Sequence, residues 1–316
     1  HFKKSADNLR SLVGRNVPGS KVETAPGLGI AMNTTPSTFT IAADTSTPLR
    51  VNRLGFGAMR ITGPGIWGEP ADRTTAIQVL RRAGELGTNF IDTADAYGPE
   101  ISEDLIREAL HPYDSITVAT KGGLTRQGPD QWAPVGRPEY LRQSVLMSLR
   151  RLGVDQIDLW QLHRIDPQVP RDEQFDCIAH MQQEGLFAHV GLSEVNVEEV
   201  QAAQKYFNVV TVQNLYNVGN RQSEELLNYC DTNMIGFIPW FPLGNRELVS
   251  KGGPLAEAAK ASDCTPSQAA LAWLLQHSPV VIPIPGTGSL DHLEENYEAI
   301  NVNLSPETIA LLDQLA

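Results

Sequence analysis

Four side chains that could together protonate an oxygen occur at or just after the ends of three short apolar segments. Asp92 and Tyr97 stand five positions apart, and Lys121 and His163 each end a later segment. A phenol with a pKa near ~10 is a poor acid at pH 7, but a neighbouring ammonium favours the phenolate and lowers that pKa. We therefore expect Lys121 to activate Tyr97. Asp92 would hold the ammonium in place and offset its desolvation, and His163 would hydrogen-bond the substrate oxygen or relay a proton.

Each of these residues, taken singly, also fits an ordinary structural role. A tyrosine after a strand often packs or caps, a lysine can be a solvated strand end, and an aspartate can cap a nearby helix. Matching residue types on three consecutive strand ends favour a catalytic site over four unrelated structural roles.

These side chains can meet only if the segments that carry them belong to one sheet. Short β-type segments alternate with stretches of helical period along most of the chain. The eight β-type segments are Leu54–Gly57, Asn89–Ala94, Ile116–Lys121, Ile157–His163, Ala188–Ser193, Val209–Asn214, Gly236–Phe241 and Val280–Pro285. The main helical patterns are Arg73–Leu86, Ser102–Leu110, Pro138–Leu152, Asp172–Glu184, Val197–Tyr206, Ser223–Thr232, Pro266–His277 and Leu290–Ile300, with a last helix after Ser305–Pro306.

Strict alternation of β and α units predicts a parallel sheet, and eight units allow closure into a single-domain (β/α)8 TIM barrel. The carboxyl ends of the strands meet at one mouth of such a barrel, where active sites lie. A doubly wound open sheet is the alternative, and it needs a glycine turn that opens directly into a helix. Gly63–Gly68 matches that glycine pattern, but Glu69–Ala71 separate it from a helix that begins near Asp72. We therefore favour the barrel.

Length and composition agree with one globular α/β domain. The chain has 316 residues, of which 41% are hydrophobic and 20% charged, and a formal net charge of -12. An acidic surface without a run of Lys and Arg disfavours nucleic acid and anionic membranes as partners. Cys177, Cys230 and Cys264 are far apart and odd in number, which indicates reduced thiols and no zinc site. We find no signal peptide and no long apolar span, and we expect a cytoplasmic protein.

Residues 1–47 are rich in Ser, Thr, Gly, Asn and Pro and lack periodicity. We expect an N-terminal tail that ends in a short hairpin around Thr38–Ala43 and Leu49–Asn52, followed by a barrel domain over residues 48–316. Two interpretations stay open for residues 1–31. They are either native, or an added leader that precedes a native start at Met32.

From about Arg50 to Ala316 the chain resembles the aldo-keto reductases. The resemblance rests on Asn89-Phe90-Ile91-Asp92-Thr93-Ala94-Asp95-Ala96-Tyr97-Gly98, on Ala119-Thr120-Lys121-Gly122 and on Asp158-Leu159-Trp160-Gln161-Leu162-His163. It implies NAD(P)H-dependent reduction of aldehydes or ketones to alcohols by a catalytic tetrad. In this tetrad Tyr97 is the general acid, Lys121 and Asp92 adjust the pKa of its phenol, and His163 orients the substrate. It also implies cofactor binding without a Rossmann fold, in agreement with the glycine argument.

The same resemblance implies a set of cofactor-binding residues. Ser193 and Gln213 would bond the nicotinamide carboxamide and Tyr216 would stack on the ring. Glu194 stands where Asn is commoner, and its carboxylate can only accept. The other residues implied are Gly57 beneath the nicotinamide, Pro242, Leu243, Gly244 and Arg246 over the pyrophosphate, and Gly286, Thr287, Gly288, His292, Glu295 and Asn296 around the adenosine end.

The family resemblance makes NADPH the expected cofactor. The family's usual anchors for the 2′-phosphate are a Lys and an Arg, and here those positions hold Gly286 and His292. A glycine-rich turn before a helix can hold phosphate through backbone N–H groups. We therefore expect NADPH to be preferred by a modest margin, with NADH usable.

The substrate is expected to be a small carbonyl compound. Trp67 is our first choice as a substrate-lining aromatic residue, and Trp132 and Trp240 come after it. The chain stops at Ala316, where many aldo-keto reductases have a longer loop over the pocket. We therefore expect an open pocket and a resemblance to the short bacterial-type and potassium-channel β-subunit branch of the family. The sequence does not indicate an oligomeric state.

Two other functions stay open at this point. The first is a redox-sensing, NADPH-binding regulatory subunit of the same fold, which an exposed apolar docking surface would favour. The second is a sugar or polyol dehydrogenase that works in the oxidative direction. The sequence has no long interaction segment, and we therefore favour the reductase.

Overall fold

The computed structural model describes residues 37–250 and 252–315. The expectations for residues 1–31, and for the tail as far as residue 36, lie outside these residues. The predicted hairpin is confirmed, because β1 (Thr38–Ile41) and β2 (Leu49–Asn52) pair antiparallel along their whole length.

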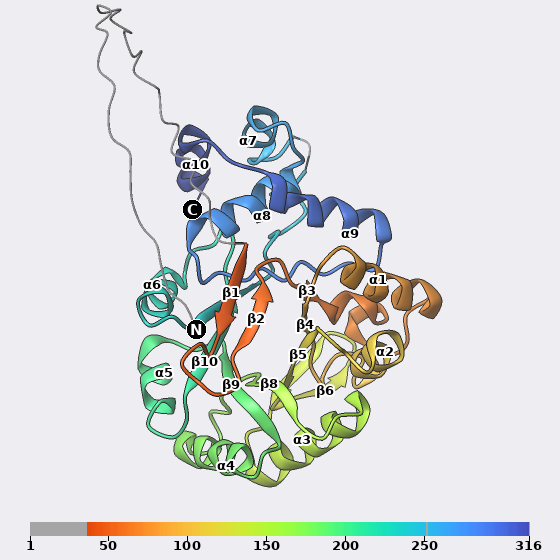
Figure 1. Ribbon diagram of the computed structural model, residues 1–316, viewed down its shortest axis with the longest axis vertical. Coiled ribbons are helices and arrows are strands. Elements are labelled where there is room, and N and C mark those ends of the chain that lie inside the picture. The colour runs from red at the N-terminus through yellow and green to blue at the C-terminus, as the bar shows by residue number, and fades with distance from the viewer. Residues whose placement is uncertain (1–36, 251, 316) are drawn as a thin grey trace, which may run out of the picture. The chain divides into compact units, whose positions relative to one another are not determined.

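A parallel, curled sheet of seven strands forms the centre of the fold (Figure 1), in the order β11-β10-β9-β8-β5-β4-β3. Its side chains are almost all buried, which explains why these segments are apolar over their length instead of alternating. The strands are β3 (Phe56–Gly57), β4 (Phe90–Asp92), β5 (Thr117–Gly122), β8 (Ile157–Leu162), β9 (Phe187–Ser193), β10 (Val209–Leu215) and β11 (Gly236–Trp240).

Seven of the eight predicted strands are thus present, and the eighth segment, Val280–Pro285, differs. It makes one parallel bridge, between Phe237 and Val281, and on its other side the Gly55 N–H donates to Pro283 O at 3.0 Å. Pro283 and Pro285 have no N–H group to continue a ladder, which accounts for the missing strand.

Helices cover the outer face of the sheet (Figure 1). Their starts follow the expected capping chemistry: Thr265 and Gln268 form a capping box, and the Asp72 side chain accepts from the Thr75 N–H. The helices are α1 (Arg73–Glu85), α2 (Ile101–Leu110), α3 (Pro138–Leu152), α4 (Arg171–Gln183), α5 (Val197–Ala203), α6 (Glu224–Thr232), α7 (Ala256–Ala261), α8 (Pro266–His277), α9 (Leu290–Tyr297) and α10 (Pro306–Leu312).

Two elements were not expected from the sequence: helix α7 and an antiparallel hairpin of β6 (Leu124–Gly128) and β7 (Gln131–Pro134). The hairpin extends from the carboxyl end of β5. The segment Gly63–Gly68 contains only a 3-10 turn, Pro64–Ile66, and α1 begins after Asp72. The rejection of a dinucleotide-binding glycine turn is therefore confirmed.

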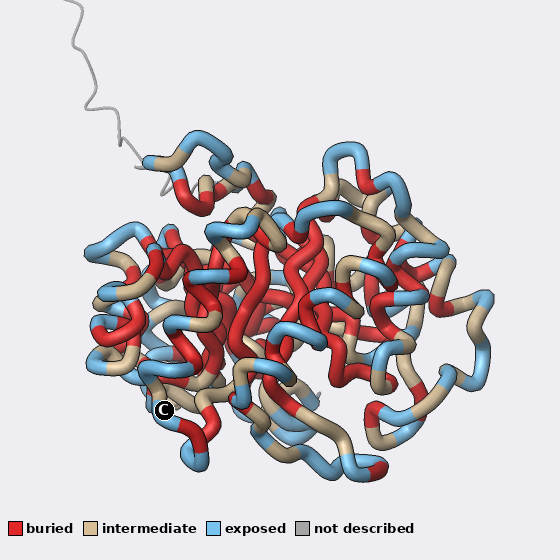
Figure 2. Tube along the Cα trace, turned by 90° about the horizontal axis from the view of Figure 1, so that it is seen from below, coloured by how far each residue is buried: buried red, intermediate tan, exposed pale blue. Residues whose placement is uncertain are grey.

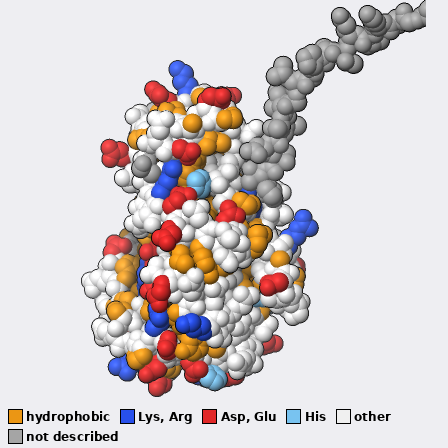
Figure 3. Space-filling model, turned by 90° about the vertical axis from the view of Figure 1, so that its left-hand side faces the viewer, with side chains coloured by type: hydrophobic (Ala, Val, Ile, Leu, Met, Phe, Trp, Pro, Cys, Tyr) orange, Lys and Arg blue, Asp and Glu red, His pale blue; other side chains and the backbone are white. Residues whose placement is uncertain are grey.

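The buried residues concentrate on the strands and on the inward faces of the helices (Figure 2). Acidic, basic and apolar side chains are interspersed on the face shown in Figure 3. Within the part of the chain that the structure describes, no helix is both long and apolar enough to cross a bilayer.

Candidate active site

A cavity of about 730 Å³ lies at the carboxyl ends of the strands, a size typical of a small-molecule site. Its walls are formed by the strand ends, by the hairpin β6–β7, by the loop that follows β11 and by the loop that follows residue 283. The lining residues are Gly57, Met59, Arg60, Ile66, Asp92, Tyr97, Leu124, Asp130, Trp132, Pro134, His163, Arg164, Ser193, Gln213, Trp240, Phe241, Pro242, Leu243, Gly244, Ile284, Pro285 and Gly286.

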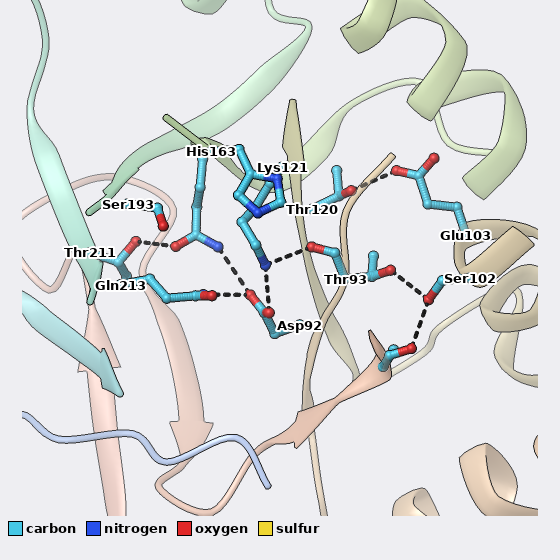
Figure 4. Close-up of polar contacts among 12 residues, drawn as sticks. Asp92, Thr93, Ser102, Glu103, Thr120, Lys121, His163, Ser193, Thr211 and Gln213 are labelled. Atoms are coloured by element: carbon cyan, nitrogen blue, oxygen red, sulfur yellow. Dashed lines mark hydrogen bonds and ion pairs between the residues drawn. The ribbon is translucent and has the colours of Figure 1, made fainter. Parts of the chain in front are cut away.

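A buried ion pair lies at the base of this cavity (Figure 4). The Lys121 Nζ is 2.6 Å from Asp92 Oδ1 and also donates to Thr93 O at 2.8 Å. Asp92 Oδ2 accepts from Gln213 Nε2 at 2.8 Å and from Gln161 Nε2 at 3.1 Å. Burial lowers the pKa of the Lys121 ammonium, but the negative groups around it outweigh burial and the net pKa is raised. Lys121 is therefore a cation at neutral pH.

Tyr97 lies beside this pair in the loop after β4 and is 6% exposed. The Lys121 Nζ is 5.2 Å from the centroid of its ring. Burial raises the pKa of the phenol, and the Lys121 charge, although it lowers the pKa, does not compensate. Our expectation of a net lowering was wrong, because it left out the cost of desolvating a phenolate.

His163 directly follows β8 and presents its ring edge-on to Tyr97, with the ring centroids 5.9 Å apart. Burial lowers the pKa of the imidazole well below its usual value, and the charges of Lys121 and Arg164 lower it further. The ring is therefore neutral at physiological pH. Its Nδ1 is buried and has no hydrogen-bond partner, so His163 offers a polar nitrogen that no protein group satisfies.

Ser193 and Gln213 line the cavity at the ends of β9 and β10, and their hydrogen bonds determine how they can act. The Arg164 Nη1 donates to Ser193 Oγ at 3.0 Å, which leaves the hydroxyl proton of Ser193 free to donate elsewhere. The Gln213 amide nitrogen donates to Asp92, which leaves its oxygen as an acceptor. One donor and one acceptor side by side complement a primary carboxamide, such as that of nicotinamide.

Tyr216 does not lie where we expected it. It is fully buried outside the cavity, where its hydroxyl donates to Glu224 and its ring stacks on Trp273 at 6.0 Å. It follows the end of β10 and packs against the helices, so it cannot stack on a ligand in the cavity. Trp240, the last residue of β11, lines the cavity instead.

The substrate-lining tryptophan also differs from our first choice. Trp67 is not part of the cavity lining, whereas Trp132 on β7 is. The Trp132 ring is 6.3 Å from the Tyr97 ring and 6.4 Å from the His163 ring. The Arg126 guanidinium lies 3.6 Å from the Trp132 centroid and stacks on it. We ranked Trp132 behind Trp67 because the hairpin that carries it was not predicted.

The expected cofactor residues divide into two groups. Gly57, Ser193, Gln213, Pro242, Leu243, Gly244 and Gly286 line the cavity, and Glu194, Tyr216, Arg246, Thr287, Gly288, His292, Glu295 and Asn296 do not. The Glu194 carboxylate accepts from the Leu215 N–H at 2.7 Å and from Trp240 Nε1 at 2.6 Å, so it joins three strand ends.

Gly57 has a reason to be glycine besides the approach to the nicotinamide that we expect of it. A Cβ on Gly57 would lie 2.6 Å from Ile284 O, and one on Gly286 would lie 2.3 Å from Gly57 O. Neither residue could carry a side chain without separating β3 from the neighbouring segment. A close approach between two parts of the backbone therefore requires glycine at both positions.

Two cavity cations were overlooked in the sequence. Arg60 is exposed on the rim, three residues after β3 ends, and Arg164 directly follows His163, two residues after β8 ends. Both follow strand ends, the position by which the other site residues were found. Within residues 37–250 and 252–315, no three His, Cys, Asp or Glu side chains are grouped to hold a metal. All three cysteines are free thiols.

Comparison with known proteins agrees with this geometry. The profile of the Aldo/keto reductase family matches residues 53–316. An uncharacterized oxidoreductase of Schizosaccharomyces pombe is 58% identical over 264 residues, covering 84% of this chain and 86% of its own length. Pyridoxine 4-dehydrogenase of Escherichia coli is 42% identical over 273 residues, covering 84% of this chain and 95% of its own.

Among solved structures, an aldo-keto reductase from Klebsiella pneumoniae in complex with NADPH is 25% identical, with a TM-score of 0.71. The match covers 84% of this chain and 91% of that chain. The family profile and the two relatives each span more than four fifths of the sequence. The chain therefore belongs to the aldo/keto reductase family and is an NAD(P)-dependent oxidoreductase that reduces carbonyl groups.

Proposed function

We propose that the cavity converts an aldehyde or ketone to an alcohol with NADPH, and that Tyr97 is the general acid. The observation that carries this assignment is the buried pair of Lys121 and Asp92 beside the phenol, with Nζ 5.2 Å from the ring centroid. When bound, the cofactor supplies a hydride to the carbonyl carbon. The chain must then supply a proton to the carbonyl oxygen.

The tetrad residues divide this task among them. The raised pKa of Tyr97 keeps the phenol protonated until the carbonyl oxygen gains negative charge. Lys121 then stabilises the phenolate that remains, because the ammonium stays charged and cannot move away from Asp92. His163 is neutral and can donate one hydrogen bond to the same oxygen.

The cavity residues also fit a nicotinamide cofactor. Ser193 and Gln213 would hold the carboxamide as donor and acceptor, and Trp240 would take the ring-stacking role first expected of Tyr216. Arg60 offers a rim cation for a phosphate group. The NADPH complex of the Klebsiella pneumoniae relative supports NADPH, and we keep the expectation of a modest preference over NADH.

We also propose a closed barrel, a branch of the family, a cellular location and first substrates for this protein. The bonds that Val280–Pro285 make to β11 and to Gly55 support a closed eight-stranded barrel over residues 48–316. Membership of the bacterial-type and potassium-channel β-subunit-like branch of the family and a cytoplasmic location remain our proposals. The name of the Escherichia coli relative makes pyridoxal, and pyridoxine in the reverse direction, the first substrates to assay.

The test of this function compares two tyrosines. We expect Tyr97→Phe to lower kcat by about 10²–10⁴-fold, since the general acid is lost, while NADPH binding measured by fluorescence titration stays near that of the wild type. Tyr216→Phe is the matched control, because its hydroxyl lies outside the cavity, and its kcat should stay within about threefold. Turnover of Tyr97→Phe within that same range would refute the assignment.

A further inference from the structure

We propose that Arg164 binds an anionic oxygen of the substrate, so that the preferred substrates are planar aldehydes or ketones that carry a carboxylate or phenolate group. This inference rests on the proposed reductase function and adds a substrate class to it. Arg164 lies at the carboxyl end of β8, directly after His163, and its half-buried side chain lines the cavity.

The guanidinium of Arg164 has donors that no protein group uses. Its Nη1 donates to His163 O at 2.6 Å and to Ser193 Oγ at 3.0 Å, and these bonds hold the head group against the cavity wall. In the described part of the chain, Nε and Nη2 have no hydrogen-bond partner, and no carboxylate lies within ion-pair distance. A planar guanidinium with a free edge is the group that binds carboxylates and phenolates best.

Arg164 also forms no ion pair with a carboxylate of the described residues. The carboxylate that acts on it most is that of Glu194. That carboxylate accepts from Leu215 and Trp240 instead. Burial lowers the pKa of the guanidinium, which shows that the cation has lost part of its hydration. A desolvated cation without a partner is costly, and an anion in the cavity would remove that cost.

Arg126, which lies beside the cavity, provides a contrast. Its Nη1 donates to Ile66 O and Ala96 O, its Nη2 donates to Gly65 O and its Nε donates to Gln131 O. Its flat face is covered by Trp132. All of its donor nitrogens are hydrogen-bonded to backbone oxygens, so Arg126 holds the surrounding loops in place. Arg164 has the free donors that a ligand needs.

The surroundings of Arg164 narrow the class of ligand. The charge of Arg164 lowers the pKa of Tyr97, so the guanidinium is near the point of proton transfer. Trp132 forms a flat wall next to Tyr97 and His163. A planar substrate against this wall can present its carbonyl to Tyr97 and an anionic oxygen to Arg164.

The test compares 3-carboxybenzaldehyde with its neutral methyl ester, methyl 3-formylbenzoate, using NADPH as cofactor. The readout is the ratio of kcat/KM for the acid to kcat/KM for the ester. We expect the wild type to prefer the acid and Arg164→Met to reduce the ratio by about 10- to 100-fold, the loss expected for a charge-assisted bond. Arg164→Lys should restore part of the ratio, because lysine keeps the positive charge but lacks the planar, bidentate geometry of the guanidinium.

Arg60→Met is the matched control, since it removes a cavity cation at the rim. We expect it to weaken NADPH binding and leave the ratio near that of the wild type. The inference is overturned if Arg164→Met lowers kcat/KM equally for both compounds, which would make Arg164 a holder of His163 and Ser193. It is also overturned if only the Kd for NADPH changes. If the wild type reduces neither compound, nor pyridoxal, the proposed function itself fails.

Discussion

Two buried ion pairs of equal length lie on opposite faces of β5. In one, Lys121 Nζ is 2.6 Å from Asp92, and in the other, Arg151 Nε is 2.6 Å from Glu103. Asp92, Lys121 and Glu103 are almost completely inaccessible to solvent and Arg151 is 9% exposed. Distance and burial therefore do not distinguish the two pairs.

The difference lies in what surrounds each pair. Side chains alternate along a strand, so Thr120 and Lys121 point to opposite faces of β5. Thr120 Oγ1 donates to Glu103 at 2.6 Å and joins the outer pair to the sheet beneath α2 and α3, while Lys121 belongs to the inner pair at the cavity (Figure 4). The inner pair lies next to a titratable phenol, and the outer pair joins packed elements.

A buried ion pair therefore indicates a catalytic role only when the groups next to it can react. Removing two charges from water is expensive, and a buried pair often adds little stability relative to apolar residues. The inner pair has a use that offsets this cost, because it can stabilise a phenolate on Tyr97. The outer pair has the structural use of joining α2, α3 and β5.

Removing the cation of each pair gives the strongest test of the difference between the two pairs. Lys121→Met and Arg151→Met should both destabilise the fold by about 3–5 kcal/mol, since each leaves a buried carboxylate without its countercharge. Only Lys121→Met should abolish catalysis, with a loss in kcat of about 10²–10⁴-fold, because the phenolate loses its stabilising charge. Thermal unfolding and steady-state kinetics on the folded fraction measure the two effects separately.

In the folded Arg151→Met protein, kcat should stay within about threefold of the wild type. A loss in Arg151→Met as large as that in Lys121→Met would show that the outer pair also supports the chemistry, and the distinction between the pairs would be wrong.

The inner pair could be predicted from the sequence, and the outer one could not. The carboxyl ends of parallel strands meet at one mouth, so Asp92, Lys121 and His163 could be placed together without coordinates. Glu103 and Arg151 lie on α2 and α3, and their meeting depends on how two helices pack. No sequence spacing encodes that contact.

The same reasoning explains the errors in the site. The distance from a strand end does not by itself give the direction of a side chain. His163 lies one residue beyond β8 and lines the cavity, whereas Tyr216 lies one residue beyond β10 and packs against the helices. Trp240 still belongs to β11 and faces the cavity. Trp132 was ranked too low because it is on a hairpin, β6–β7, that the strand-helix alternation does not predict. The direction of the Tyr97 pKa required knowing how deeply the phenol is buried.

Asp95 lies between the two ion pairs, and its ionisation should have a smaller effect, on stability. Its backbone N–H donates to Lys121 O at 3.1 Å, while its side chain accepts from Ser144 and lies near Glu103. Burial, and then the charge of Glu103, raise the pKa of this carboxyl from 3.8 to about 7. The folded state thus holds the proton more tightly than the unfolded state. The stability that this proton provides is complete below about 3.8 and is lost as the pH rises through about 7.

We therefore expect the Tm of the wild type to fall between pH 5 and pH 8 by several degrees more than that of Asp95→Asn, whose amide cannot ionise. The amide oxygen keeps the acceptor for Ser144, which makes the substitution conservative. Differential scanning calorimetry across this range measures the effect. Parallel Tm curves for the two proteins would mean that Asp95 does not carry the pH dependence.

The smallest test removes one neutral donor from each pair. Gln161→Met removes the bond from Nε2 to Asp92 and also the longer bond, 3.3 Å, that Oε1 accepts from Thr211, and Thr120→Val removes the bond from Oγ1 to Glu103. Each should lower the free energy of unfolding by about 1.5–3 kcal/mol, the range for a hydrogen bond to a charged group, as measured by urea denaturation. Only Gln161→Met should lower kcat, and by less than about tenfold, because Gln213 still holds Asp92. If Thr120→Val lowered kcat by as much, a change on one face of β5 would pass to the other through the strand itself, and the two pairs would have to be treated as one unit.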